Sequence, residues 1–185
     1  MPAAARCIFL NRLRQRYPMT SIVVMGVAGC GKSSLGQRVA LALGRTLVEG
    51  DDFHPPANVA KMRAGTPLTD ADRTGWLDAL AAELQRHPDG AVLTCSALKR
   101  AYRERLRAAG PGLRFVHLVL DREESRRRVT ERSGGHYFGA SLVDSQFDAL
   151  EDPAGEPGVL SVDATASLDD LAAHVVRWLQ EGGAA

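Results

Sequence analysis

The sequence predicts a three-layer α/β/α domain built on a five-stranded parallel sheet, and three observations support this fold class. Short apolar runs rich in β-branched residues alternate with longer segments of helical periodicity. The apolar runs are continuous, as in strands that helices cover on both faces. A glycine-rich loop joins the first apolar run to the first helical segment. At 185 residues the chain has the length of one such domain.

The expected strands are the apolar runs Ser21–Met25, Thr46–Glu49, Ala91–Cys95, Arg114–Leu120 and Val159–Val162. Between and after them, apolar side chains recur three or four residues apart, as Leu35, Val39 and Leu43 do in the first helical segment. The expected helices are Ser34–Leu43, Asp70–Gln85, Ala97–Ala108, Glu123–Arg132, Ser141–Leu150 and Leu168–Leu179. Right-handed crossovers then place helices on both faces of the sheet. We expect a single domain over residues 19–185, preceded by a disordered extension at 1–18.

Residues 26–33 read Gly-Val-Ala-Gly-Cys-Gly-Lys-Ser, which fits the phosphate loop G-x-x-x-x-G-K-[ST] between a strand and a helix. Main-chain N–H groups and the helix N-terminus of such a loop form a positive concavity that binds polyphosphate. Lys32 would reach the β- and γ-phosphates of ATP, and Ser33 would bind Mg²⁺. A chance glycine turn is the alternative, which the flanking strand and helix disfavour. The expected nucleotide-binding residues are Gly26, Val27, Ala28, Gly29, Cys30, Gly31, Lys32, Ser33 and Ser34.

Composition argues against several classes of partner. With 23 basic and 22 acidic residues the net charge is +1, so bulk charge gives no case for binding nucleic acid or an anionic membrane. No run approaches the roughly 20 apolar residues that span a bilayer. The three cysteines, Cys7, Cys30 and Cys95, are too widely spaced for a disulfide framework or a metal motif, which favours a reducing cytoplasm.

Polar residues follow the expected strands, and ligands of open parallel sheets collect at that edge. Asp51 follows the second strand, and we expect it to act as general base or to orient the acceptor hydroxyl, in preference to capping a helix. The third strand ends in Thr94-Cys95-Ser96 and offers no Walker B aspartate. The expected magnesium ligands are therefore Ser33, phosphate oxygens and water.

A basic segment and a glycine hinge predict a helical lid over about residues 123–140. The segment contains Arg126, Arg127, Arg128 and Arg132, and Ser133-Gly134-Gly135 follows it. We expect Arg128 and Arg132 to bind the nucleotide, with Arg128 neutralising charge during transfer. A solvated basic helix face is an equally good interpretation of the same residues.

Further segments of the chain resemble the P-loop gluconokinases, in the same order, from about Ile22 to Val162. They are Gly50-Asp51-Asp52-Phe53-His54-Pro55, Gly65-Thr66-Pro67-Leu68, Cys95-Ser96-Ala97-Leu98-Lys99, His136-Tyr137-Phe138, Ser145-Gln146-Phe147 and Leu150-Glu151-Asp152-Pro153. The resemblance implies a P-loop kinase fold with a substrate segment at about residues 51–86, a homodimer, and ATP-dependent phosphorylation of D-gluconate on its 6-hydroxyl. The substrate-binding residues that it implies are Asp51, His54, Lys61, Arg73, Lys99, Arg103, His136 and Gln146.

Alternatives stay open at this point. Structural ion pairs or caps near the cleft are the less favoured alternative for Lys99, Arg103 and Gln146. The acceptor could be another small hydroxylated acid such as shikimate, because composition alone does not distinguish the two acids. A nucleotide-binding switch protein is disfavoured, because such proteins more often carry the third-strand aspartate that is missing here.

Overall fold

The computed structural model describes residues 20–131 and 140–182, which form a five-stranded, fully parallel sheet with the strand order β2-β3-β1-β4-β5. The predicted fold class is confirmed, and each strand lies within one residue of its expected ends. The strands are β1 (Ile22–Met25), β2 (Thr46–Glu49), β3 (Ala91–Thr94), β4 (Arg114–Val119) and β5 (Val159–Asp163).

The central strand β1 supplies side chains to two separate cores. Ile22 and Val24 belong to one apolar cluster and Val23 and Met25 to the other, because successive side chains of a strand point to opposite faces. All four are fully buried. Since β1 lies between β3 and β4, the strand order reverses direction at its carboxyl end. This is the topological switch point at which open α/β sheets bind ligands.

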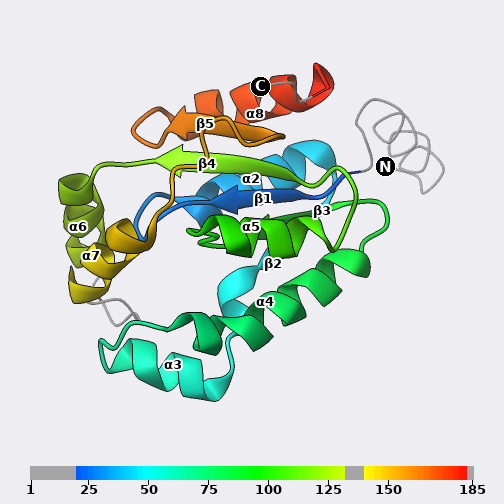
Figure 1. The fold of residues 1–185 in the computed structure, drawn as a ribbon. Helices are drawn as coiled ribbons and strands as arrows, with labels where there is room; N and C mark the ends of the chain where they lie inside the picture. The colour runs from blue at the N-terminus through cyan, green and yellow to red at the C-terminus, as the bar shows by residue number, and fades with distance from the viewer. Residues whose placement is uncertain (1–19, 132–139, 183–185) are drawn as a thin grey trace, which may run out of the picture.

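Two helices cover each face of the sheet, with the sheet running between them (Figure 1). On one face α2 (Lys32–Leu43) and α8 (Leu168–Gln180) pack through buried apolar residues, and these include Leu35, Val39, Val175 and Trp178. On the other face α4 (Asp70–Gln85) and α5 (Arg100–Arg107) do so through Trp76, Leu80, Tyr102 and Leu106. The three layers therefore follow from the apolar periodicity of each helix.

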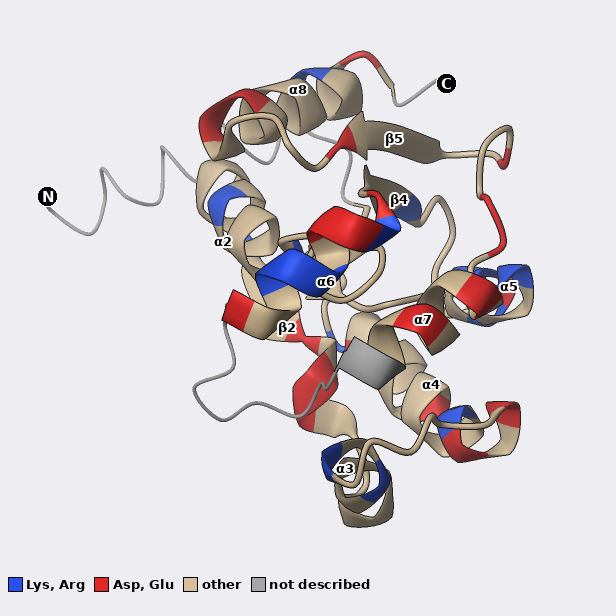
Figure 2. Ribbon diagram, turned by 90° about the vertical axis from the view of Figure 1, so that its left-hand side faces the viewer, with Lys and Arg blue, Asp and Glu red and all other residues tan. Residues whose placement is uncertain are grey.

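Two further helices, α6 (Arg122–Glu131) and α7 (Ala140–Ala149), lie beyond the carboxyl ends of the strands (Figures 1 and 2). They pack against each other and are joined by ion pairs. Arg122 contacts Asp144 at 3.4 Å and Asp148 at 2.8 Å, and Arg126 also reaches Asp144. Two arginines of α6 thus pair with α7, whereas Arg127 and Arg128 pair with Glu124 within α6.

Three details of the fold differ from the sequence-based expectation. Helix α3 (Pro56–Arg63) was not predicted, because only Asn58 and Met62 of its residues are buried and no apolar stripe marks it. The short 3₁₀ helix η1 (Gly50–Phe53) was also missed. Helix α5 begins at Arg100 rather than Ala97, because Ala97 has φ 43° and Lys99 is extended, and neither conformation continues a helix.

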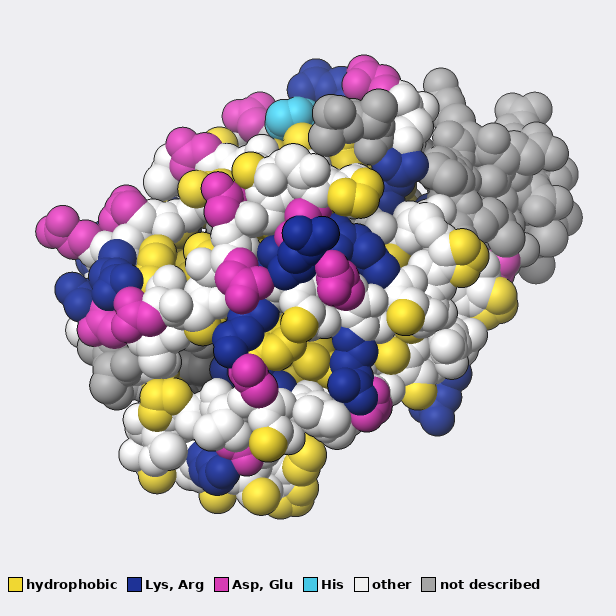
Figure 3. All heavy atoms as spheres, viewed as in Figure 1, with side chains coloured by type: hydrophobic (Ala, Val, Ile, Leu, Met, Phe, Trp, Pro, Cys, Tyr) yellow, Lys and Arg dark blue, Asp and Glu magenta, His cyan; other side chains and the backbone are white. Residues whose placement is uncertain are grey.

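On the face drawn in Figure 3, basic and acidic side chains are interspersed, without a broad patch of one sign. Part of this mixing is direct pairing on α4 and α5, where Arg100 contacts Glu104 at 2.9 Å and Arg105 contacts Asp78. In the part of the chain that the structure describes, no helix has both the length and the apolar character to cross a membrane.

Candidate active site

The loop between β1 and α2 has a conformation that requires glycine. Gly26 has φ 140°, and a Cβ built there would lie 2.8 Å from the Leu118 carbonyl oxygen and 2.9 Å from the Cys30 sulfur. Gly31, with φ 97°, is the N-cap residue of α2 and provides no side-chain cap. The first N–H groups of α2 therefore have no partner within the helix, and the helix dipole makes this end attractive to anions.

The loop opens into a cleft at the carboxyl edge of the sheet, where β1, β2 and β3 end. Helices α3, α4, α6 and α7 add the remaining walls. Of the lining residues, Met62 and Val129 were not named as candidates from the sequence, and Ser96 was expected only as a residue at the end of a strand. The full lining is Ala28, Gly29, Gly31, Lys32, Ser33, Ser34, Asp51, His54, Met62, Arg73, Ser96, Val129 and Gln146.

Lys32 is folded back over the loop, where its Nζ donates to the carbonyl oxygens of Gly26 at 3.2 Å and Val27 at 3.0 Å. The ammonium thus lies beside the helix N-terminus, at a position from which it can exchange carbonyl oxygens for phosphate oxygens. The other expected loop residues Val27 and Cys30 point their side chains into the protein and are 2% exposed. Their contribution to a nucleotide site is limited to the main chain.

Glu49, to which sequence reasoning assigned no role, lies next to the predicted metal ligand Ser33. The Ser33 hydroxyl donates to its Oε2 at 3.0 Å, and the Thr94 hydroxyl donates to the same oxygen. Glu49 is the last residue of β2 and Thr94 the last of β3, and these residues are register partners. The signal in the sequence that points to Glu49 is its position at a strand end, two residues before Asp51.

Asp51 is held at the cleft by close packing of the preceding residue. A Cβ at Gly50 would lie 2.2 Å from the Thr94 carbonyl oxygen, so only glycine lets η1 approach β3 this closely. The Trp76 indole N–H also donates to the Gly50 carbonyl oxygen at 2.7 Å. The Asp51 carboxylate itself is 66% exposed and lines the cleft. The carboxylate is therefore exposed to the cleft, on a backbone that close packing holds in place.

His54 is stacked on the Trp76 ring, with the ring centroids 4.3 Å apart and the planes 13° from parallel. Its side chain is 3% exposed, and its Nε2 lies 3.9 Å from Asp51 Oδ1. Burial lowers the pKa of His54 to about 4, against the opposing effect of the Asp51 charge. The buried Nδ1 has no hydrogen-bond partner among the described residues. His54 is thus a neutral imidazole with one unused polar atom in the cleft wall.

Of the predicted substrate-binding cations Lys61, Arg73 and Lys99, Arg73 alone lines the cleft. Lys61 Nζ contacts Asp72 Oδ1 at 2.7 Å, and Lys99 Nζ contacts both oxygens of Asp70 at 2.7 and 2.8 Å. These two lysines are paired with acids at the start of α4, so they would have to leave those partners to contact a substrate.

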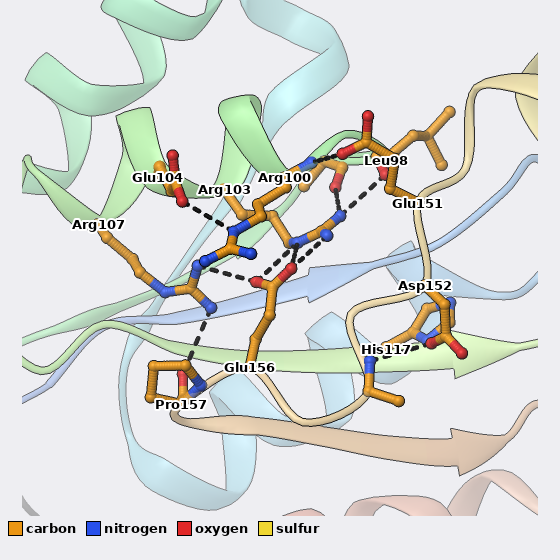
Figure 4. Close-up of polar contacts among 12 residues, drawn as sticks. Leu98, Arg100, Arg103, Glu104, Arg107, His117, Glu151, Asp152, Glu156 and Pro157 are labelled. Carbon is orange, nitrogen blue, oxygen red and sulfur yellow. Dashed lines mark hydrogen bonds and ion pairs between the residues drawn. The ribbon is translucent and has the colours of Figure 1, made fainter.

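Arg103 does not face the cleft. Its side chain is fully buried, and its Nε lies 3.1 and 3.0 Å from the two carboxylate oxygens of Glu156 (Figure 4). Its Nη1 donates to the carbonyl oxygens of Ala97 at 3.0 Å and Leu98 at 2.8 Å. This is the structural ion pair that the sequence left as the alternative to a substrate contact. From its buried position, Arg103 supports the turn after β3 through these two hydrogen bonds.

Gln146 and Arg128 both lie close to the phosphate loop. Gln146 lines the cleft, and its Oε1 accepts a hydrogen bond from the Ala28 N–H at 2.7 Å. The Cβ of Arg128 packs near Gly29, but its guanidinium group turns to Glu124 at 2.6 Å and to the Ala164 carbonyl oxygen at 3.2 Å. The Glu124 pKa falls to about 2 because Arg127 and Arg128 hydrogen-bond its carboxylate.

Comparison with known proteins identifies the family of this chain. A family model described as AAA domain matches residues 22–157. The gluconokinase of Gluconobacter oxydans (strain 621H) is 44% identical over 163 residues, which cover 86% of this chain and 90% of that protein. The crystal structure of a gluconokinase from Sinorhizobium meliloti 1021 is 43% identical, with a TM-score of 0.80 over 90% of this chain and 96% of that one. The chain belongs to the gluconokinase family.

The fold of this gluconokinase-family protein is shared more widely than its sequence. Shikimate kinase from Acinetobacter baumannii superposes with a TM-score of 0.61 over 92% of this chain and 98% of that one, at 16% identity. That likeness shows the fold alone, so it gives no support to shikimate as the acceptor. The lid residue Arg132 and the predicted substrate residue His136 lie outside the residues that the structure describes.

Proposed function

We propose that this protein transfers the γ-phosphate of ATP to the 6-hydroxyl of D-gluconate, giving 6-phospho-D-gluconate and ADP. One observation carries the proposal: a phosphate loop and the Asp51 carboxylate share one cleft, in a chain 44% identical to a gluconokinase over most of its length. Phosphoryl transfer needs chiefly a positioned acceptor hydroxyl and neutralisation of charge on the phosphates. The cleft supplies groups for both.

On the donor side, the N-terminus of α2 and Lys32 bind the phosphates. The helix N–H groups are already oriented, so their electrostatic contribution requires no rearrangement when charge develops in the transition state. Lys32 Nζ lies beside the Gly26 and Val27 carbonyl oxygens and reaches the phosphates by giving up those contacts. Arg128 and Arg132 complete the charge neutralisation from the lid, with Arg128 leaving its contact with Glu124.

On the acceptor side, Asp51 accepts the proton of the attacking hydroxyl or orients that hydroxyl. Neutral His54 lines the cleft and hydrogen-bonds a gluconate hydroxyl through its imidazole, and Arg73 pairs with the gluconate carboxylate. Lys61, Lys99 and His136 are proposed as further contacts. Arg103 acts indirectly, by supporting the turn that carries Lys99.

Magnesium fits the oxygen donors at the end of β2. Ser33, Glu49 and Thr94 offer two hydroxyls and a carboxylate within one hydrogen-bonded group, and Mg²⁺ prefers such hard oxygen ligands. The described residues contain no cluster of three or more His, Cys, Asp or Glu side chains that could hold a metal by itself. A metal bound jointly by phosphate oxygens, water and one or two side chains fits this donor set. When bound, it would neutralise phosphate charge, and Glu49 would hold Ser33 in position.

A homodimer and a cytoplasmic location are also proposed. The resemblance to gluconokinases suggests the dimer, and analytical ultracentrifugation tests it. Cys30 and Cys95 are both free and buried, which is consistent with a reducing compartment.

A coupled assay of ADP release tests the proposed function. With ATP and Mg²⁺, gluconate should stimulate turnover, while shikimate and nucleoside monophosphates should not. Lys32→Ala and Asp51→Asn should each lower kcat by about two to three orders of magnitude. Asp52→Asn is the matched control, because Asp52 is an exposed neighbour of Asp51 that does not line the cleft. ATP consumption that no acceptor changes would contradict the proposal and favour a nucleotide switch.

A further inference from the structure

Ala28 of the phosphate loop is held at both of its main-chain polar groups by side chains that are distant in sequence. Its N–H donates to Gln146 Oε1 of α7 at 2.7 Å. Its carbonyl oxygen accepts from the Ser125 hydroxyl of α6, also at 2.7 Å. Ser125 is fully buried, and Gln146 and Ala28 are each 7% exposed. Both hydrogen bonds are therefore shielded from water. Loss of one partner would leave a buried polar group unsatisfied, which is costly.

Apolar packing strengthens this contact between the loop and the two helices. The Ala28 methyl group lies in a small cluster with Val129 of α6 and Val143 of α7, and Phe147 packs against it. Gly29 is also in close contact, since a Cβ there would lie 3.1 Å from the Ser125 carbonyl oxygen and 3.2 Å from Val129. The loop thus rests on α6 and α7, which ion pairs already join to each other.

The hydrogen bond from Ser125 to the Ala28 carbonyl oxygen also sets the direction of the next N–H group in the phosphate loop, because a peptide group is planar. The Ala28 carbonyl and the Gly29 N–H belong to one peptide, so fixing the carbonyl toward Ser125 fixes the opposite direction for the Gly29 N–H. Ala28 cannot give its own N–H to a phosphate while Gln146 accepts it. Ala28 was expected among the nucleotide-binding residues, and in this conformation its N–H is not available for that contact.

We propose that Ser125 and Gln146 are positioning residues that hold the phosphate loop in its nucleotide-binding conformation through Ala28. The proposal rests on the proposed kinase function and changes the part assigned to Gln146. Its oxygen serves the donor site, whereas the resemblance to the family placed the residue at the acceptor. Nucleotide affinity should accordingly depend on two residues of α6 and α7, even when no gluconate is present.

The test compares ADP binding with gluconate kinetics in Ser125→Ala and Gln146→Met. We expect each variant to bind Mg·ADP about five- to tenfold more weakly by isothermal titration calorimetry without gluconate, as loss of one buried hydrogen bond predicts. The KM for gluconate at saturating ATP should stay within twofold of the wild-type value. Ser145→Ala is the matched control, because Ser145 neighbours Gln146 but donates to Leu142 within its own helix. Its ADP affinity should be unchanged.

The outcomes separate the two assignments. A higher KM for gluconate with unchanged ADP affinity in Gln146→Met would make Gln146 an acceptor-binding residue and overturn the proposal, as would unchanged values in both variants. Should either variant fail to fold, amide exchange by NMR on the wild-type protein decides. The Ala28 amide must then be protected without nucleotide, and rapid exchange refutes the proposal. Failure of the wild-type protein to phosphorylate gluconate would refute the proposed function but leave the ADP titration valid.

Discussion

Replacing Glu156 by glutamine is expected to remove a large part of the stability of this protein, because it leaves a buried charge unpaired. Arg103 is fully buried, and the Glu156 carboxylate balances both Arg103 and, at 2.9 Å, Arg107 (Figure 4). Although burial opposes ionisation, hydrogen bonds from Arg103 and Arg107 hold the pKa of Glu156 below its usual range. The pair is therefore ionised at neutral pH.

Breaking such a pair on one side costs about 3–5 kcal/mol, and each kcal/mol lowers Tm by about 2–4 °C in a domain of this size. We thus expect Glu156→Gln to lower Tm by about 6–20 °C, measured by circular dichroism at pH 7. Glu104→Gln on α5 is the matched control. Its carboxylate also pairs with an arginine, Arg100, but is 58% exposed, so the loss should be about 1–2 °C.

A second variant separates charge from packing. Arg103→Met combined with Glu156→Gln removes both buried charges, so the double variant should melt above Glu156→Gln alone. Loss of the Glu156 charge affects Arg107 less than Arg103, because the Arg107 side chain is 22% exposed and water can solvate it. A Tm for Glu156→Gln within about 2 °C of the wild type would refute the reasoning, since it would show that the buried guanidinium does not need its counterion.

Three further changes test the two sides of the cleft. Lys99→Ala should raise the KM for gluconate about tenfold with a smaller effect on kcat in steady-state assays, and an unchanged KM would show that Lys99 only pairs with Asp70. Glu49→Gln should raise the Mg²⁺ concentration for half-maximal activity about tenfold, measured by metal titration, and an unchanged requirement would separate Glu49 from the metal. His54→Gln should flatten the pH dependence of stability. With a pKa of about 4 when folded, lowered by burial, and about 6.5 when unfolded, His54 binds more protons in the unfolded state between these values, so the wild type loses stability as pH falls from 6.5 toward 4. Urea unfolding across this range checks the slope, and equal slopes in both proteins would contradict the assignment.

Much of the fold was predictable because its signals are local. The strand β1 is a continuous apolar run because its side chains are buried alternately in two cores. The helix α4 was predicted with the right bounds, Asp70–Gln85, and the structure explains its start. Thr69 and Asp72 form a capping box in which each side chain accepts the other's main-chain N–H. Helix α3 was missed because its small buried surface leaves no periodic pattern.

The sequence alone determined the phosphate loop and the strand-end position of Asp51, because a glycine pattern and a strand boundary act over a few residues. Only the tertiary structure decided what these groups touch. Glu49 meets Thr94 because β2 and β3 are in register, Arg103 turns inward to Glu156, and Gln146 reaches Ala28 across 118 positions of the chain. Such contacts depend on how the crossovers bring distant elements together, and no local pattern of residue types encodes which side chain will then find which partner.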